Sequence, residues 1–324
     1  MLGCRSRWSS PVAWIHSWDS FLRSFRGGQG RRCVDPPHSR FGSSLDLSGE
    51  ARWPPDRAGA VIVRLEGERV AVFRQADHAR LSGTLAAAWG RDPWGAPRPF
   101  PAVTVAARQH DDAWIPYDEA PDVRDGRPLA FHEVDRVRTA ALYQAGIASV
   151  AQLDPYAGLL VSLHYSGFFT SHWGWAPFST PARFPGPQAH ALREFLRGEE
   201  LRQHGLRRDA GLGPGDEAGL ELNYKLLQLW DRISLDVCRQ PSDLPWAVEY
   251  PPVRPATGAA EVSLKLAMVA PGRYVLNPYP LLAEPFRAGI PCVVMDAGHP
   301  TRERFLGDWR TAPETPMRIS IDAP

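Results

Sequence analysis

The sequence has little cysteine and no long hydrophobic run. Its four cysteines are scattered over 324 residues without a CxxC pair, which excludes a disulfide-bonded scaffold. The longest apolar runs, such as residues 157–163, are far shorter than the roughly 20 residues that cross a bilayer. These absences predict a soluble, cytoplasmic protein with no membrane partner.

An excess of charge of either sign is also absent. The chain has 37 basic and 36 acidic residues, a net charge of +1, so the charge balance gives no indication of a nucleic-acid partner. Lysine is nearly missing, since Lys225 and Lys265 are the only two, which indicates the codon bias of a GC-rich genome rather than a function. The hydrophobic share of 44% is enough for a sizeable core.

The first 60 residues differ in composition from the rest of the chain. They hold half of the serines and carry a net charge of +4, whereas residues 61–324 carry a net charge of −3. Glycine and proline pairs interrupt them, and they show no sustained periodicity. We expect residues 1–60 to be a disordered or spurious extension, with a targeting peptide as the alternative. Residues 61–324 are then expected to form a single domain.

Regular patterns begin at Val61. Two β-rich runs, 61–65 and 70–73, flank Glu66-Gly67-Glu68 and predict a hairpin. Helical patterns follow over 77–89, 102–114, 134–150, 154–169, 188–209 and 216–238, and short strands are expected over 261–269, 272–276, 291–295 and 317–321. This order predicts an α+β fold, mainly helical, in which the N-terminal hairpin and the C-terminal strands form a small antiparallel sheet.

Polar side chains interrupt the apolar stripes of four predicted helices. His78, His110, His164 and Asp231 occupy inward-facing positions by helical spacing, and Asp111 follows His110 directly. Because a buried carboxylate needs a partner, one divalent metal ion bound from several helices would satisfy the whole set. Imidazoles with carboxylates suit Mn²⁺, Fe²⁺, Mg²⁺ or Zn²⁺, and such an ion lowers the pKa of a bound water.

The order of these residues resembles a known metal-binding signature. His78, the His110-Asp111 doublet and Asp231 are similar to the ligand set of the HD superfamily, which comprises helical, metal-dependent phosphohydrolases and some di-iron oxygenases. The resemblance covers roughly residues 70–240. It implies an HD-like helical core in which these four residues bind the metal.

The same resemblance implies two further roles. Asp111 would orient the attacking water, and His164 would contact a second metal or the substrate phosphate. Two features depart from the pattern: 67 residues separate His164 from Asp231, which requires an inserted helix over 188–209, and Asp112 replaces the more common apolar residue after the doublet.

Three segments resemble an uncharacterised bacterial family known as a domain of unknown function. They are residues 75–83, 109–114 and 162–167, and the likeness extends over most of 61–300. It implies no activity, but it suggests that members begin near Val61, which agrees with the change in composition.

Together these features predict a metal-dependent hydrolase, first of all a phosphohydrolase, in which a metal-activated water attacks a small-molecule substrate. Two alternatives remain open. One is an HD-type, iron-dependent oxygenase that uses the same ligands. The other is a non-catalytic binding protein with a structural His/Asp cluster, in which each histidine bonds to a carbonyl group and Asp231 pairs with an arginine or caps a loop.

Overall fold

The computed structural model describes residues 61–124, 126–172, 180–299 and 301–324. All of them belong to one compact unit, Pro54–Pro324. The expectations for residues 1–60, and the middle of the aromatic loop after Phe169, lie outside the described residues.

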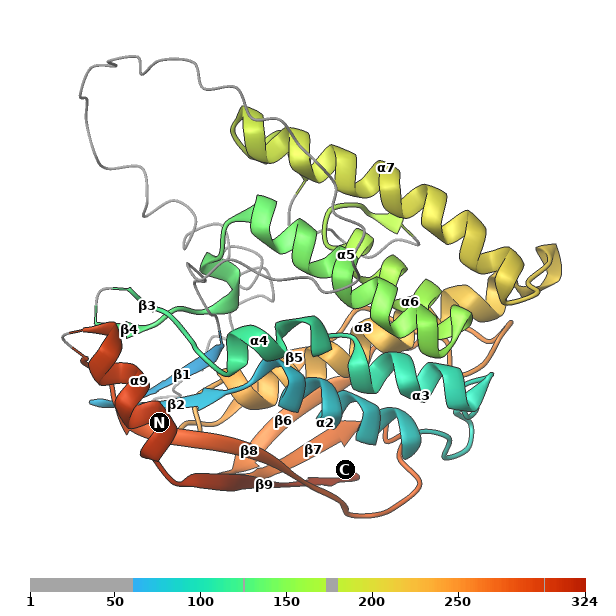
Figure 1. Cartoon of the computed structure of the whole chain (residues 1–324). Helices are drawn as coiled ribbons and strands as arrows, with labels where there is room; N and C mark the ends of the chain where they lie inside the picture. Colours follow the sequence, from blue (N-terminus) through green and yellow to red (C-terminus); the bar gives the residue numbers. More distant parts are fainter. Residues whose placement is uncertain (1–60, 125, 173–179, 300) are drawn as a thin grey trace, which may run out of the picture. The chain divides into compact units, whose positions relative to one another are not determined.

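The described chain has an α+β fold, and Figure 1 shows helices gathered over a curled sheet. The strands are β1 (Ile62–Glu66), β2 (Arg69–Phe73), β3 (Val123–Arg124), β4 (Arg127–Pro128), β5 (Trp246–Glu249), β6 (Lys265–Ala270), β7 (Arg273–Asn277), β8 (Phe286–Asp296) and β9 (Glu314–Asp322). The helices are α2 (Gln75–Ala87), α3 (Phe100–Gln109), α4 (Ile115–Asp118), α5 (Arg136–Leu153), α6 (Pro155–Gly167), α7 (Gly186–Asp209), α8 (Glu217–Arg239) and α9 (Arg302–Thr311). Each predicted helix is present, except that the one predicted over 102–114 ends at Gln109, and the HD-like character of the helical core stays a prediction.

The sheet is larger than the sequence predicts. Its seven strands follow the order β1-β2-β8-β9-β7-β6-β5. The hairpin of β1 and β2 joins the C-terminal strands through antiparallel pairing of β2 with β8, as expected. The predicted antiparallel sheet is present, but it is larger than expected and includes a parallel pair, because β9 inserts between β8 and β7 and runs parallel to β7. The alternation of apolar and polar residues along a strand cannot reveal this insertion, because the insertion depends on pairing between distant segments.

The sequence of strand β2 is apolar without alternation because both faces of the strand are buried. Ala71 and Phe73 point into the main core beneath the helices, whereas Val70 and Val72 belong to a second cluster with Phe305 of α9. Both faces of β2 are therefore covered, and Figure 1 shows α9 beside β8, the strand that pairs with β2. A strand that is buried on both faces is expected to read as a continuous apolar run. Helix α9 itself was not predicted.

Two local features bring the helices into position. Helix α6 begins where the sequence indicates: Asp154 Oδ1 accepts a hydrogen bond from the Ala157 backbone N–H at 2.9 Å, and Pro155 occupies the first helical position. Helices α2 and α3 pack closely at Gly83, where a Cβ atom would lie 2.6 Å from the Arg108 Cβ. Glycine at this position therefore allows the two helices to approach each other.

None of the helices in the described ranges combines the length and the hydropathy that a membrane span requires.

Candidate metal centre

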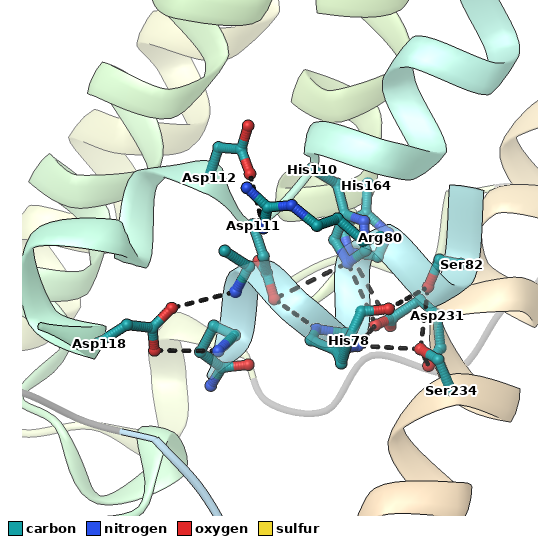
Figure 2. Close-up of polar contacts among 12 residues, drawn as sticks. His78, Arg80, Ser82, His110, Asp111, Asp112, Asp118, His164, Asp231 and Ser234 are labelled. Carbon is teal, nitrogen blue, oxygen red and sulfur yellow. Dashed lines mark hydrogen bonds and ion pairs between the residues drawn. The ribbon is translucent and has the colours of Figure 1, made fainter. Parts of the chain in front are cut away.

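Five polar side chains from distant parts of the sequence meet between α2, α3, α6 and α8 (Figure 2). We call them the His/Asp cluster: His78, His110, Asp111, His164 and Asp231. They are the residues that the sequence predicted as metal ligands or catalytic groups. No side chain of the cluster is more than 12% exposed, so the cluster lies inside the helical layer.

His78 is placed by the first turn of α2. The residue before this helix, Arg74, makes no side-chain capping bond. Instead the Asp118 carboxylate, at the end of α4, accepts hydrogen bonds from the backbone N–H groups of Gln75 at 2.9 Å and Ala76 at 3.0 Å. Asp118 therefore caps α2 from outside the helix, satisfying two N–H groups that lack intrahelical partners. This cap fixes the turn that carries His78.

The His110-Asp111 doublet lies at a break in the chain and not within a helix. Helix α3 ends at Gln109, His110 follows as its C-terminal cap, and Asp111 has φ −108° and ψ 13° before the short 3-10 turn Asp112–Trp114. The single helix predicted over 102–114 is therefore wrong in its second half. Because the chain leaves the helix here, two adjacent side chains can face the same cluster.

Three ligand-type atoms converge within the cluster. His78, His110 and Asp231 each offer one atom, and these atoms all lie within 4.8 Å of one another. His110 Nε2 is 3.4 Å from Asp231 Oδ1. The Asp111 carboxylate lies beside this group, with its Oδ2 atom 2.8 Å from His78 Nε2 and 3.7 Å from His110 Nε2.

Hydrogen bonds on the outer side of the rings determine which nitrogen faces the cluster. His110 Nδ1 lies 2.9 Å from the Ala107 carbonyl oxygen, which can only accept, so Nδ1 carries a proton and Nε2 faces the cluster. His78 Nδ1 lies 2.9 Å from Ser234 Oγ, whose hydroxyl donates to the Asp231 carbonyl oxygen at 2.8 Å. Ser234 Oγ can then accept from His78 Nδ1, while His78 Nε2 lies 2.8 Å from Asp111 Oδ2 on the other side of the ring.

A second hydroxyl group completes this arrangement. Ser82 Oγ lies 2.8 Å from Ser234 Oγ and 3.3 Å from the His78 and Trp230 carbonyl oxygens. The two serines form a buried pair behind His78, visible at the lower right of Figure 2. Outer hydrogen bonds of this kind set the tautomer and orientation of metal-binding histidines.

Several atoms of the cluster are buried without a partner. Among the described residues, His110 Nε2, both ring nitrogens of His164, and Asp231 Oδ2 make no hydrogen bond. Leaving a buried polar atom unsatisfied costs roughly 1–3 kcal/mol, and native proteins hold few such atoms. We call these unpartnered atoms the open atoms of the cluster. Two of them, His164 Nε2 and Asp231 Oδ2, lie 3.9 Å apart and face each other.

A divalent ion fits these atoms in chemical type and in spacing. Imidazole nitrogen with carboxylate oxygen is a donor set for Zn²⁺, Fe²⁺ or Mn²⁺. Two ligands at about 2.1 Å from one ion lie roughly 3 Å apart at a right angle and about 3.4 Å apart in a tetrahedron. The 3.4 Å between His110 Nε2 and Asp231 Oδ1 matches this range, and the ligand atoms of His78, His110 and Asp231 all lie within 4.8 Å of one another. The cluster could therefore hold a metal ion through His78, His110 and Asp231.

The electrostatics of the cluster also favour a cation. Burial raises the pKa of a carboxyl group, but the surrounding histidines outweigh it and lower the pKa values of Asp111 and Asp231. Burial lowers the pKa of His164 to about 4, so its ring is neutral. Burial opposes the charged form of His110 as well, yet the carboxylates of Asp111 and Asp231 raise its pKa to about 9. Two ionised carboxylates, the neutral ring of His164 and the protonated ring of His110 thus face the centre, and a metal ion that binds there would displace a proton from His110.

Sequence reasoning missed the residues that hold the cluster in place. They are Ser82, Asp118, Tyr165 and Ser234. Ser234 follows Asp231 by three residues and Tyr165 follows His164 directly, but serine and tyrosine on a buried helix face are typical of ordinary core packing. Only the partners, which lie more than 50 residues away, distinguish Tyr165 and Ser234 from core residues.

Comparisons with known proteins identify a family but no function. No curated protein and no solved structure matches the chain. The resemblance to the HD superfamily stays a prediction. The sequence profile of a family described as "Protein of unknown function (DUF3891)" matches residues 61–297, which covers the hairpin, the whole His/Asp cluster and most of the sheet. The chain therefore belongs to the DUF3891 family.

Proposed function

We propose that the protein is a metal-dependent hydrolase whose substrate is a small phosphate ester. The observation that carries the proposal is the convergence of buried ligand atoms from His78, His110 and Asp231 within 4.8 Å, with open atoms facing the centre. A bound divalent ion would supply a Lewis acid that polarises a phosphoryl oxygen and makes water acidic at neutral pH.

Each residue of the His/Asp cluster has a proposed role in the reaction. His78, His110, Asp111 and Asp231 would hold the ion, and the Asp111 carboxylate would also orient the attacking water by accepting a hydrogen bond from it. Asp111 suits this role because its pKa is lowered, which keeps it ionised, and because its side chain, at 12% exposure, is the most accessible of the cluster. Neutral His164 has both ring nitrogens open and can bind a substrate oxygen.

An arginine next to Asp112, the residue after Asp111, supports a phosphorylated substrate. Arg80 Nη1 is 3.8 Å from Asp77 Oδ1 and 3.9 Å from Asp112 Oδ1, too far for hydrogen bonds, and the side chain is 42% exposed. Figure 2 shows the Arg80 side chain reaching Asp112, which follows Asp111 in the sequence. A guanidinium with free donors can bind phosphate oxygens in a forked geometry.

One observation favours an iron-dependent oxygenase as a second candidate. The three atoms that lie within 4.8 Å of one another come from two histidines and one carboxylate. Two histidines and one carboxylate that leave the other coordination positions of the ion open form the facial triad of non-haem Fe(II) oxygenases. In contrast, a purely structural cluster would be expected to satisfy its own polar atoms, which this cluster does not.

The test begins with metal analysis of the full chain purified without chelator. Wild-type protein should carry about one equivalent of a divalent metal, and His110→Ala and Asp231→Ala should lose it. His299→Ala is the matched control, because His299 is also buried but pairs with Asp308 outside the cluster.

Activity assays then separate the two candidates. The hydrolase should release phosphate from a generic phosphomonoester with Mn²⁺, Mg²⁺ or Zn²⁺, and the two cluster variants should not. Iron with oxygen consumption and no phosphate release would favour the oxygenase. Wild-type protein that binds none of these metals would overturn both.

A further inference from the structure

A tyrosine, Tyr165, contacts the His/Asp cluster although it is not one of the proposed metal ligands. Tyr165 follows His164 on α6 and is fully buried. Its hydroxyl donates to Asp111 Oδ1 at 2.8 Å and also contacts the His110 carbonyl oxygen. One side chain thus reaches both members of the doublet.

The Asp111 carboxylate needs such a contact because the turn in which Asp111 lies does not hold its side chain in one orientation. It lies in the turn between α3 and the following 3-10 turn, and its side chain makes no capping bond there. Its two oxygens are divided between neighbours: Oδ1 accepts from Tyr165, and Oδ2 faces His78 Nε2 at 2.8 Å. Without the tyrosine hydroxyl, Oδ1 would lose its partner and the carboxylate could rotate toward solvent, where it is already 12% exposed.

The ring of Tyr165 is itself held firmly. It stacks on Tyr143 with ring centroids 3.8 Å apart and planes 16° apart, and it meets the edge of Phe168 at 5.8 Å. Aromatic contacts of this type fix the ring without help from the hydroxyl group. The hydroxyl can therefore be removed while the packing is retained.

We propose that Tyr165 is a positioning residue that holds the Asp111 carboxylate with Oδ2 toward His78 and His110, in the orientation that a metal ion and its water require. The inference rests on the proposed function, because it assumes that the cluster binds a metal. A direct role with substrate does not fit, since Tyr165 is fully buried and its hydroxyl, within the described part of the chain, contacts acceptor atoms of His110 and Asp111.

The test uses Co²⁺ as a probe, because its visible absorption reports the number and geometry of its ligands. Metal-free wild-type protein and Tyr165→Phe are titrated with Co²⁺ while the spectrum is recorded. We expect the variant to bind Co²⁺ about tenfold or more weakly, with an altered spectrum, since loss of an outer hydrogen bond to a ligand costs roughly 10–100-fold in affinity.

Tyr250→Phe is the matched control. Tyr250 is also buried, and its hydroxyl donates to a buried carboxylate, Asp236 Oδ2, at 3.2 Å, but Asp236 does not belong to the His/Asp cluster. This variant should bind Co²⁺ as the wild type does. A thermal melt of each variant confirms that the protein is folded.

A double-mutant cycle shows whether Tyr165 acts through Asp111. In an Asp111→Ala background, Tyr165→Phe should have no further effect on Co²⁺ affinity or spectrum. An additional tenfold loss there, or wild-type binding in the single variant, would overturn the positioning role while leaving the metal site intact. Failure of wild-type protein to bind Co²⁺ would instead overturn the metal site and, with it, this inference.

Discussion

Helix α6 contributes to two buried polar clusters that differ in how their atoms are satisfied. Toward α7, Ser162 Oγ donates to Glu199 Oε2 at 2.9 Å and accepts from Gln203 Nε2 at 2.9 Å, and Arg202 pairs with Glu199 at 3.1 Å. Two residues after Ser162 along the helix, His164 has both ring nitrogens without a partner among the described residues. We call the first group the Ser/Glu cluster: Ser162, Glu199, Arg202 and Gln203.

The difference separates a structural network from a candidate binding site. In the Ser/Glu cluster, no buried side-chain nitrogen or oxygen lacks a partner within the described residues, so its hydrogen bonds join α6 to α7 and are complete. In the His/Asp cluster, the open atoms are imidazole nitrogens and a carboxylate oxygen, which are the atoms that divalent metals bind. Burial alone does not distinguish the two groups, because both contain fully buried side chains.

The largest expected effect is the loss of metal in Asp231→Ala. Asp231 offers one oxygen to the group around His110 and the other toward His164, so its removal should weaken metal binding by more than about 100-fold. Metal content after dialysis, measured by mass spectrometry, checks this. Retained stoichiometric metal in the variant would show that Asp231 is not a ligand.

The matched substitution in the Ser/Glu cluster should act on stability instead. Glu199→Ala removes a fully buried carboxylate that pairs with Ser162 and Arg202, which should cost about 3 kcal/mol in the free energy of unfolding. Urea denaturation measures the loss. Metal content should equal that of the wild type, and a parallel loss of metal would erase the distinction between the clusters.

Removal of the metal from wild-type protein should have a slightly smaller effect on stability. An ion at 100 times its dissociation constant stabilises the fold by about 2.7 kcal/mol, so treatment with a chelator should lower the melting temperature by roughly 5 °C or more. Asp231→Ala should melt at the same temperature with and without chelator. A chelator effect of equal size in that variant would place the ion elsewhere.

The smallest expected effect concerns the hydroxyl group behind His78. Ser234→Ala removes the partner of His78 Nδ1, so the ring loses the bond that presents Nε2, and metal affinity should fall about tenfold. Ser162→Ala is the control, since it removes a buried hydroxyl from the Ser/Glu cluster. Equal metal affinities in the two variants, measured by competition with a chromogenic chelator, would contradict the proposed role of Ser234.

The sequence predicted the residues of the His/Asp cluster but not the backbone that presents them. Helical spacing places His78, His164 and Asp231 on apolar stripes, and polar groups there stand out because they need partners. Asp111 was assigned to a helix, whereas the chain breaks at Gln109 and presents the doublet from a turn. Such a break depends on tertiary contacts, and single-sequence periodicity does not report it.

The fold was likewise predicted where its signals are local. Asp154-Pro155 marks the start of α6, and Gly67 marks the turn between β1 and β2. The position of β9 between β8 and β7, and the cap that Asp118 gives to α2, join segments far apart in the sequence. No pattern along the chain specifies such partners, so they could not be predicted.

The most direct measurement is a crystal structure of the full chain grown with Zn²⁺ or Co²⁺, with anomalous diffraction data collected at the metal edge. We predict an anomalous peak at about 2.0–2.2 Å from ligand atoms of His78, His110 and Asp231. An empty centre, with the open atoms of His110, His164 and Asp231 bonded to ordered water instead, would contradict the metal site.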